Sequence, residues 1–257
     1  MEPVTIIGTP VSPFVRKVLV CLDLKRVPYQ VDPIVAFFTG DAFEEVSPLR
    51  LIPVLMHGDV MLTDSSVICE YIDEAFPGYS LLPSDPADRA RARWLDEYAD
   101  TRLAAVLLWK LFNEATVNPS VWGQKRDVRA LLRIVKEDVP PLMDYLESQL
   151  PQDSFLFGEL GLADISIAAQ FRNAGWARFA PDADRWPNVA GFVERVLSHP
   201  VVAALAPLEN AMMTTPIADQ RAVAASHGLA LTETTFMEST VAKPGPMTTR
   251  RAGNASS

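Results

Sequence analysis

The chain has 257 residues, of which 49% are hydrophobic and 21% are charged, as is ordinary for a soluble globular protein with one or two cores. Its formal net charge of −9 argues against nucleic acid or an anionic membrane as the main partner, so any anion site must be local. The sequence contains no apolar run of about 20 residues, so no membrane-spanning helix is predicted, and no secretory segment is expected before Val4. Two cysteines, Cys21 and Cys69, make no disulfide framework. We therefore expect a reducing, cytoplasmic compartment.

Strand and helix patterns alternate over the first 80 residues. A short apolar strand is predicted over 4–7, and residues 13–26 predict a helix with Val15, Val18 and Leu19 inward and with Arg16, Lys17 and Asp23 turned away. A second strand over 29–31 then favours a parallel pair. A hairpin with strands over 54–56 and 60–62 follows, and a helix over 65–76 closes the unit.

Beyond a breaker-rich linker with Pro77, Pro83 and Pro86, strand patterns nearly vanish. Amphipathic helices are predicted over 87–114 and 124–150, the second kinked or broken at Pro140 and Pro141. Residues 162–177 are apolar almost all round, which predicts a buried central helix, and two short helices are predicted over 188–198 and 201–205.

Periodicity fades after Thr214. The pattern allows one short helix over 218–226, and disorder is expected from Lys243 onward. The sequence therefore predicts an α/β domain over 1–82, an all-helical domain over 83–213, and a partly disordered C-terminal extension over 214–257.

The segment Ile52-Pro53-Val54-Leu55 places a proline at the start of an apolar strand. Proline has no N–H to donate to a sheet, so it is expected at a first residue, an edge or a bulge. An X–Pro bond tolerates the cis form, and we predict a cis Pro53. The N–H and C=O of Ile52 would then face a cleft, where they could pair with an extended, peptide-like ligand.

Asp64 and Ser65 follow the hairpin and open the next predicted helix. Hydroxyl and amide donors at a helix N-terminus favour a carboxylate ligand. The same residues also fit a plain helix cap, and the trio Asp64-Ser65-Ser66 does not decide between the two interpretations. Next to Ile52 and Pro53, the ligand interpretation is favoured.

Five motifs in chain order resemble the cytosolic glutathione transferases over roughly residues 3–207. They are SPFVRKV at 12–18, IPVL at 52–55, LTDSSVI at 62–68, Phe157-Gly158 with Leu162-Ala163-Asp164, and the stretch from Trp186-Pro187-Asn188 to Ser198-His199-Pro200. The resemblance implies an α/β thioredoxin-like N-terminal domain that binds glutathione, followed by an all-α C-terminal domain. The same scaffold also serves proteins that are not enzymes.

Carried over by position, the resemblance assigns glutathione-binding roles to four residues. Ile52 would pair its backbone with the cysteinyl part of the tripeptide, and Pro53 would be the cis-proline. Asp64 and Ser65 would hold the γ-glutamyl end.

The resemblance also makes Ser12 the catalytic residue, in a serine-type arrangement like that of the tau, zeta and theta classes. Ser12 and Val15 stand where dithiol oxidoreductases of this fold carry Cys-x-x-Cys, so dithiol chemistry is excluded at this site. A free thiol with a pKa near 8.5 is only about 3% ionised at pH 7, and a hydroxyl donor with a helix N-terminus would favour the thiolate. Ser12 followed by Pro13 also fits a simple helix N-cap.

Two residues depart from the family pattern. Leu51 stands where the family commonly has a basic or polar residue that helps to hold the glycyl carboxylate, and Arg50 is the candidate substitute. Gly161 stands where the family usually has Ser or Thr as a cap three residues before the buried aspartate. Glycine is a tolerable cap, so we expect Asp164 to serve folding.

We therefore predict a glutathione transferase that conjugates glutathione, its cosubstrate, to small hydrophobic electrophiles in detoxification, without a metal. The alternatives are glutathione-dependent peroxide or disulfide reduction and a non-catalytic binding module. Trp94, Tyr98, Arg102, Trp109 and Phe112 lie on or beside the helix face that usually walls the second-substrate pocket, although at helical spacing they also fit core or dimer contacts.

The resemblance suggests a two-fold homodimer. Phe37, Phe38 and Phe43 are too apolar for a freely exposed loop, and we expect them in the contact between subunits.

Overall fold

The computed structural model describes residues 3–244. The chain divides into two compact units, one formed by the described residues of Met1–Tyr79 and Pro200–Ser257 and the other by Ser80–His199. The first unit thus contains residues from all three predicted parts of the chain, because the residues from Pro200 onward belong with the N-terminal α/β domain.

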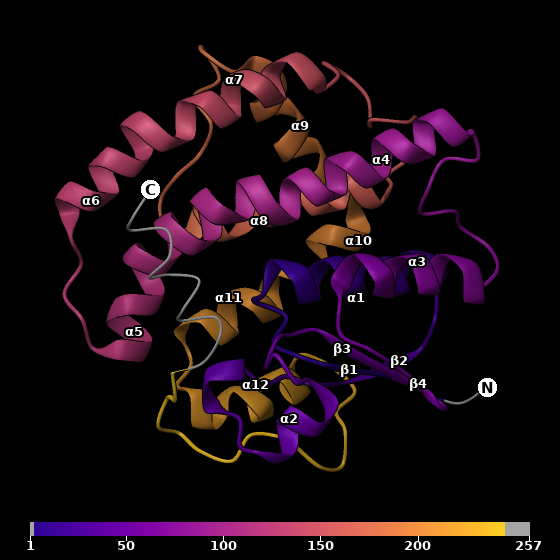
Figure 1. Cartoon of the computed structure of the whole chain (residues 1–257), viewed down its shortest axis with the longest axis vertical. Helices are drawn as coiled ribbons and strands as arrows, with labels where there is room; N and C mark the ends of the chain where they lie inside the picture. The colour runs from indigo at the N-terminus through magenta and orange to yellow at the C-terminus, as the bar shows by residue number, and fades with distance from the viewer. Residues whose placement is uncertain (1–2, 245–257) are drawn as a thin grey trace. The chain divides into compact units, whose positions relative to one another are not determined.

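The first unit is built on a four-stranded mixed sheet with the strand order β2-β1-β3-β4 (Figure 1). Strand β1 pairs in parallel with β2 and antiparallel with β3, and β3 pairs antiparallel with β4. The strands are β1 (Val4–Ile7), β2 (Tyr29–Asp32), β3 (Val54–His57) and β4 (Val60–Leu62). The predicted strands, the parallel pair and the hairpin are all confirmed.

Helices α1 (Pro13–Lys25) and α3 (Ser65–Ala75) pack against each other on one side of this sheet, and α2 (Ala42–Val46) lies on the other side (Figure 1). A short 3-10 turn, η1 (Ala36–Phe38), precedes α2. Cys21 of α1 and Cys69 of α3 form no disulfide, as the sequence predicted, and the structure buries both thiols fully.

Four helical segments from the C-terminal part of the chain complete the first unit. They are α10 (Pro200–Ala203), α11 (Ala206–Thr214), the 3-10 turn η4 (Ile217–Asp219) and α12 (Gln220–Ser226). Helix α12 confirms the short helix that the pattern allowed, whereas α11 was not predicted. Leu208 and Met212 of α11 form a small core with Ala224 of α12.

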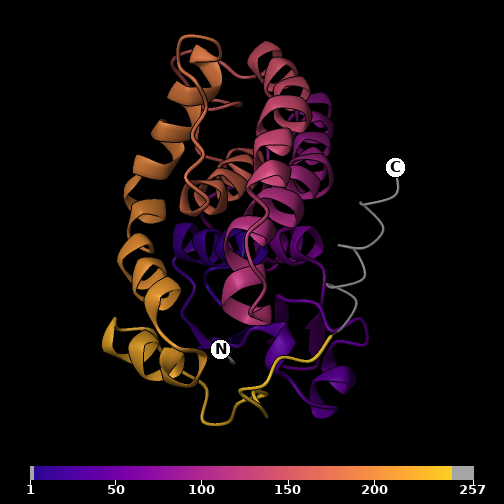
Figure 2. The ribbon, with the colours of Figure 1, turned by 90° about the vertical axis from the view of Figure 1, so that its left-hand side faces the viewer.

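Residues 229–243, here called the C-terminal strap, run along the N-terminal part of the unit (Figure 2). Val31 of β2 donates its N–H to Ala230 at 2.8 Å and accepts from the N–H of Thr232 at 3.2 Å. Further along, Glu238 donates to Phe38 at 3.2 Å, and Lys243 donates to Phe37 at 2.8 Å. The predicted disorder concerns mainly residues 245–257, which lie outside the described residues.

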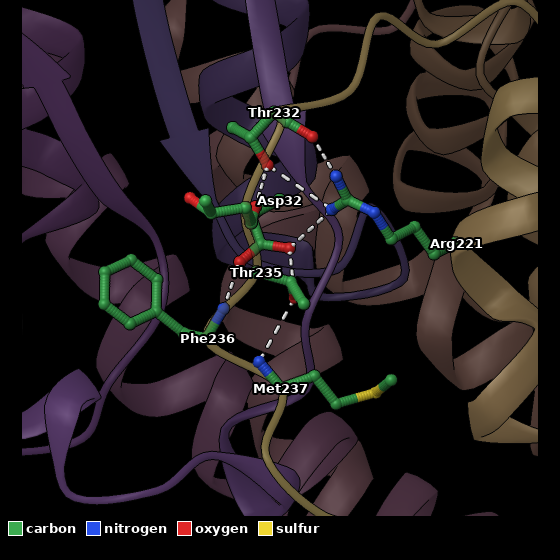
Figure 3. A network of polar contacts seen from close by, with 7 residues as sticks. Asp32, Arg221, Thr232, Thr235, Phe236 and Met237 are labelled. Carbon is green, nitrogen blue, oxygen red and sulfur yellow. Dashed lines mark hydrogen bonds and ion pairs between the residues drawn. The ribbon is translucent and has the colours of Figure 1, made fainter.

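Asp32, at the end of β2, ties the strap to the sheet (Figure 3). Its carboxylate accepts hydrogen bonds from Arg221 of α12 at 3.0 Å, from the Thr235 hydroxyl at 2.7 Å and from the Phe236 N–H at 2.8 Å. Arg221 donates in addition to the carbonyl of Thr232. Burial raises the pKa of Asp32, and these donors partly offset the effect.

Phe37, Phe38 and Phe43 are buried within this unit, with exposed fractions of 7%, 7% and 0%. The strap accounts for part of this burial, because the ring of Phe236 lies 5.8 Å from that of Phe43 and the backbone of Phe38 pairs with the strap. The expectation that these three side chains form the subunit contact is therefore corrected. Their apolar character is satisfied inside the chain.

The second unit is helical apart from isolated β-bridges between residues 155 and 159. Its long first helix comprises α4 (Pro86–Tyr98) and the π-type stretch η2 (Ala99–Val117), and is followed by α5 (Asn118–Trp122), α6 (Val128–Arg133), the π-type stretch η3 (Ile134–Asp138), α7 (Val139–Gln149), α8 (Leu162–Trp176) and α9 (Pro187–Ser198). Helix α8 is buried over most of its length, as predicted, and packs on α4, η2 and α9.

Pro140 and Pro141 do not break the helix that contains them. They lie at the start of α7, directly after η3, and the backbone on either side of Asp138 stays helical. The preceding residues, 134–138, adopt wider π-type turns. The predicted disruption therefore takes the form of a change in hydrogen bonding inside one helical rod (Figure 1).

Within residues 3–244, no single helix has both the length and the apolar character needed to cross a bilayer. Helices Pro187–Ser198 and Pro200–Thr214 meet that test only when they are taken together as a bent pair.

Candidate active site

Ser12, the predicted catalytic residue, lies at the N-terminus of α1. Its N–H donates to Thr9 at 3.0 Å, its carbonyl accepts from Arg16 at 2.9 Å, and Pro13 is the first helical residue. Its side chain is partly exposed and makes no capping hydrogen bond. The backbone of Ser12 is thus fixed, while its hydroxyl is left uncommitted at the positive end of the helix dipole.

The Ile52–Pro53 loop approaches the end of β1 at Gly8. The Ile52–Pro53 peptide is cis, as predicted. Gly8 has φ +145°, and a Cβ at this position would lie 2.6 Å from Val15 Cγ2 and 3.0 Å from Ile52 Cβ, so a side chain does not fit. Pairing of β3 with β1 begins at Val54, so Ile52 precedes the ladder.

The N-terminus of α3 is capped by Asp64. Its Oδ1 accepts from the N–H of Ser66 at 3.0 Å and from that of Val67 at 3.1 Å. Both bonds use one oxygen, so Oδ2 of this exposed carboxylate remains open to a ligand. Ser65 is the first helical residue and is 7% exposed. Asp64 therefore does cap the helix, and the cap leaves half of its carboxylate unused.

Arg16 and Lys17 were expected to face solvent, and the structure corrects this: they are 2% and 1% exposed. Lys17 donates to the Ser66 hydroxyl at 3.2 Å and so joins α1 to the first turn of α3. These long side chains lie inside because the folded unit supplies them with polar partners from other elements.

Arg16 forms a buried ion pair with Glu209 of α11, in which each side chain is 2% exposed. Arg16 Nη2 also donates to the carbonyl of Val11 at 3.3 Å, and Val11 packs against the core that α11 and α12 form. The residue directly before Ser12 is therefore held by the C-terminal helices. The sequence did not reveal this, because Glu209 lies 193 residues from Arg16.

The sequence suggested that Arg50 could replace a basic residue at position 51 in holding the glycyl carboxylate. In the structure, its guanidinium is engaged in other contacts. Its Nη2 donates to the carbonyl of Thr39 at 2.8 Å and to the Thr39 hydroxyl at 3.2 Å, and its Nη1 lies 3.5 Å from Glu44. The N–H of Leu51 donates to the Ser47 hydroxyl at 2.9 Å. Arg50 thus fastens the loop before β3 to the residues before α2.

Three of the aromatic residues singled out on the long helix, Trp94, Tyr98 and Phe112, have ring partners within the second unit. Tyr98 packs on Tyr145 with ring centroids 4.7 Å apart, and burial raises the pKa of Tyr98 to about 12. Phe112 is buried beside Trp176, whereas Trp94 is 51% exposed with its edge toward Tyr145. Tyr98 and Phe112 therefore contribute to packing of the helical unit.

Asp164 stabilises the start of α8, as expected. Its carboxylate accepts from the N–H of Gly161 at 2.9 Å and from that of Leu156 at 2.8 Å. Burial raises the pKa of Asp164 to about 6, and these hydrogen bonds partly offset the rise. A Cβ at Gly161 would lie 3.1 Å from the carbonyl of Leu81, which leaves little room for the usual Ser or Thr.

Comparison with known proteins gives the fold and this site a family. Residues 6–80 match the model of the glutathione S-transferase N-terminal domain, and residues 117–205 match that of the C-terminal domain. A probable glutathione S-transferase of Solanum tuberosum is 33% identical over 174 residues, which cover 64% of this chain and 70% of the relative. Glutathione S-transferase U7 of Arabidopsis thaliana is 27% identical over 219 residues, covering 81% and 89%.

Solved structures agree with this assignment. A glutathione S-transferase from Rhodospirillum rubrum F11 superposes with a TM-score of 0.71 at 26% identity, covering 79% of this chain and 91% of that one. FzlA from C. crescentus has a TM-score of 0.70 at 23% identity and covers 90% and 96%, which shows likeness of fold. The chain belongs to the glutathione S-transferase family, and its similarity to plant enzymes of that name supports the enzyme class predicted from the sequence.

Proposed function

We propose that this protein conjugates glutathione to small hydrophobic electrophiles and that Ser12 stabilises the reacting thiolate. The observation that carries the proposal is the uncommitted hydroxyl of Ser12 at the N-terminus of α1. A hydrogen bond to sulfur together with the helix dipole would lower the thiol pKa by about 2 units, equivalent to about 2.7 kcal/mol.

In this proposal Ile52 pairs its backbone with the cysteinyl part of glutathione, beside the cis-Pro53. Ser65 donates to the γ-glutamyl carboxylate at the start of α3, and Oδ2 of Asp64 receives the α-ammonium group. The open Oδ2 and the position of Ile52 ahead of the strand ladder support these roles.

The chemistry requires only an ionised cosubstrate and a nearby electrophile. The thiolate sulfur attacks an electrophilic carbon, a C–S bond forms, and the electron pair leaves with a departing group or moves onto an activated double bond that then takes a proton. The role of Ser12 is to keep its proton and donate it as a hydrogen bond to sulfur. The proposed scheme includes no metal step.

We further propose that the protein works in the cytoplasm as a homodimer in detoxification. The family assignment supports both the dimer and the detoxification role. With the three phenylalanines buried, Met61 of β4 and Val67 of α3 are the better candidates for the subunit contact, since they are 47% and 51% exposed. Light scattering at micromolar concentration should give the dimer mass, and a monomer would contradict this part of the proposal.

The main test compares the parent protein with Ser12→Ala. Retention on immobilised glutathione and conjugation of chlorodinitrobenzene are measured for both across a pH series. We expect the variant to retain glutathione, to conjugate roughly ten- to a hundred-fold more slowly at neutral pH, and to need a higher pH to regain its rate, since about 1.4–2.7 kcal/mol of thiolate stabilisation is lost.

An unchanged pH profile in Ser12→Ala would show that another donor ionises the thiol. Hydroperoxide reduction by a parent protein that does not conjugate would favour the reductase alternative. A parent protein that neither binds glutathione nor turns over would refute the proposal and leave the non-catalytic module.

A further inference from the structure

An exposed apolar stripe lies on the first half of the helical rod formed by α6, η3 and α7. Val128, Leu132 and Val135 follow one another at spacings of four and three residues, which places them on one face of the rod. Their exposed fractions are 64%, 53% and 37%. The other face is anchored in the helical unit through Ile134, which is 6% exposed.

Cations border this stripe, although the chain as a whole is acidic. Arg129, Arg133 and Lys136 follow the same rod at similar spacing, one residue after each member of the stripe, and Lys125 precedes it. All four residues are exposed, and none makes an ion pair with another residue of the described range 3–244. Residues 125–136 carry five cations and one anion, Asp127, which is a local net charge of +4 in a chain whose net charge is −9, and Glu137 follows directly.

The face is held in place before any partner arrives. The Asp127 carboxylate caps α6 by accepting from the backbone N–H of Arg129 at 2.9 Å and from that of Ala130 at 3.0 Å, and the N–H of Asp127 donates to the Glu114 carboxylate at 2.7 Å. Arg126 donates to the carbonyl of Ala115 at 2.6 Å. The start of the rod is therefore fastened to the end of η2, so binding would require little further ordering.

We propose that this face, Val128, Leu132 and Val135 with Arg129, Arg133 and Lys136, binds an acidic amphipathic helix of another protein. Apolar residues of such a helix would cover the aliphatic stripe, and its carboxylates would meet the cations along the border. The charge pattern specifies an acidic partner, and the periodic apolar stripe specifies a helical one.

A membrane fits this face less well. Helices that lie on bilayers bury a broad apolar face rich in Trp, Phe and Leu, whereas this stripe has two valines and one leucine. The overall charge of −9 would also oppose an anionic lipid surface.

A second copy of the chain fits less well than a separate protein. The other large apolar side chains found exposed in residues 3–244 are Leu49, Met61, Val67, Trp94 and Val241. They are scattered over different elements and form no helical stripe that could lie along this rod.

The proposal is tested with a designed, labelled peptide of about 20 residues, long enough to form a helix, with leucines at helical spacing and glutamates elsewhere. Fluorescence anisotropy is measured with the full chain. One control peptide has the same composition in an order without helical periodicity, and a second replaces each glutamate with lysine. We expect binding of the acidic amphipathic peptide alone, weakening as salt is added.

Leu132→Glu and the double variant Arg129→Glu with Arg133→Glu should each weaken this binding about tenfold or more, a loss of about 1.4 kcal/mol. Leu49→Glu is the matched control, because Leu49 is exposed to 63% on the other unit and its variant should bind as the parent does. Melting temperatures near that of the parent verify folding, and glutathione conjugation should be unchanged in all three variants.

Absence of binding, equal binding of the scrambled peptide, or equal loss in Leu49→Glu would overturn the proposal. Sedimentation with vesicles containing phosphatidylserine and the oligomeric state of Leu132→Glu test the other occupants. Vesicle binding abolished by Leu132→Glu without peptide binding would assign the face to a membrane. Loss of self-association in this variant would assign it to a second copy.

Discussion

The N-termini of α1 and α3 lie in the same unit and begin with similar polar residues, but their side chains are used differently. The Asp64 carboxylate accepts two backbone hydrogen bonds at the start of α3, whereas the Ser12 hydroxyl accepts none at the start of α1. Helix α1 is stabilised from elsewhere, through Arg16 and Glu209. Ser12 is therefore a better candidate for a chemical role than Asp64, because its hydroxyl is not used in capping and α1 is held by other contacts.

The largest effect is expected when the ion pair between Arg16 of α1 and Glu209 of α11 is removed. Glu209→Ala leaves Arg16 buried without its carboxylate, and we expect a loss of about 3–5 kcal/mol in the free energy of unfolding, measured by urea denaturation. Glu209→Gln should lose less, because an acceptor for Arg16 remains. Pairing Arg16→Met with Glu209→Leu should restore much of the stability, and a loss below 1 kcal/mol in Glu209→Ala would show that the pair contributes little.

The N-terminus of α8 extends the comparison to a cap that responds to pH. Because the pKa of Asp164 is raised from 3.8 to about 6, the folded chain binds a proton there more readily than the unfolded chain. This contribution to stability is present below the ordinary pKa and is lost as pH rises through about 6. On acidification, the parent should therefore gain stability relative to Asp164→Asn.

We expect that relative gain to be about 1 kcal/mol between about pH 7.5 and about pH 5. Urea denaturation of both proteins at the two pH values measures it, and the difference between them cancels the shared effect of other acids such as Asp23. A relative stability that is independent of pH would contradict the raised pKa.

The smallest expected effect sharpens the contrast between α1 and α3 directly. Asp64→Ala removes a cap that forms two hydrogen bonds and should cost about 1 kcal/mol of unfolding free energy. Ser12→Ala should cost less than half of this, since no capping bond is lost. Thermal denaturation of the two variants side by side provides the measurement, and equal losses would mean that Ser12 is a cap after all.

Local patterns predicted most of the architecture. Alternating strands, amphipathic helices and the cis Pro53 depend on neighbours in sequence, and the structure confirms each of them. The cap was one of two roles that the sequence left open for Asp64, and Asp64 does cap α3. The burial of Arg16 and Lys17 was missed because their partners, Glu209 and Ser66, are distant in the chain.

The same limit explains the errors about surfaces. Phe37, Phe38 and Phe43 were assigned to a subunit contact, since nothing nearby in sequence could cover them, yet the strap does so in part from some 200 residues away. Conversely, Val128 and Leu132 are apolar residues at helical spacing within the predicted amphipathic helix over 124–150, and the structure leaves both side chains exposed. Periodicity identifies an apolar face and is silent about what lies against it.

The division of the first unit between the two ends of the chain has a consequence for biosynthesis. The residues of Ser80–His199 form a contiguous unit, so they can fold as soon as they leave the ribosome. Until Glu209, Arg221 and the strap have been synthesised, Arg16, Asp32 and the edge of β2 lack the partners that they have in the folded chain. A chain that stalls or ends before these residues would have an unpaired edge at β2 and an Arg16 without its carboxylate partner. An unpaired strand edge favours aggregation.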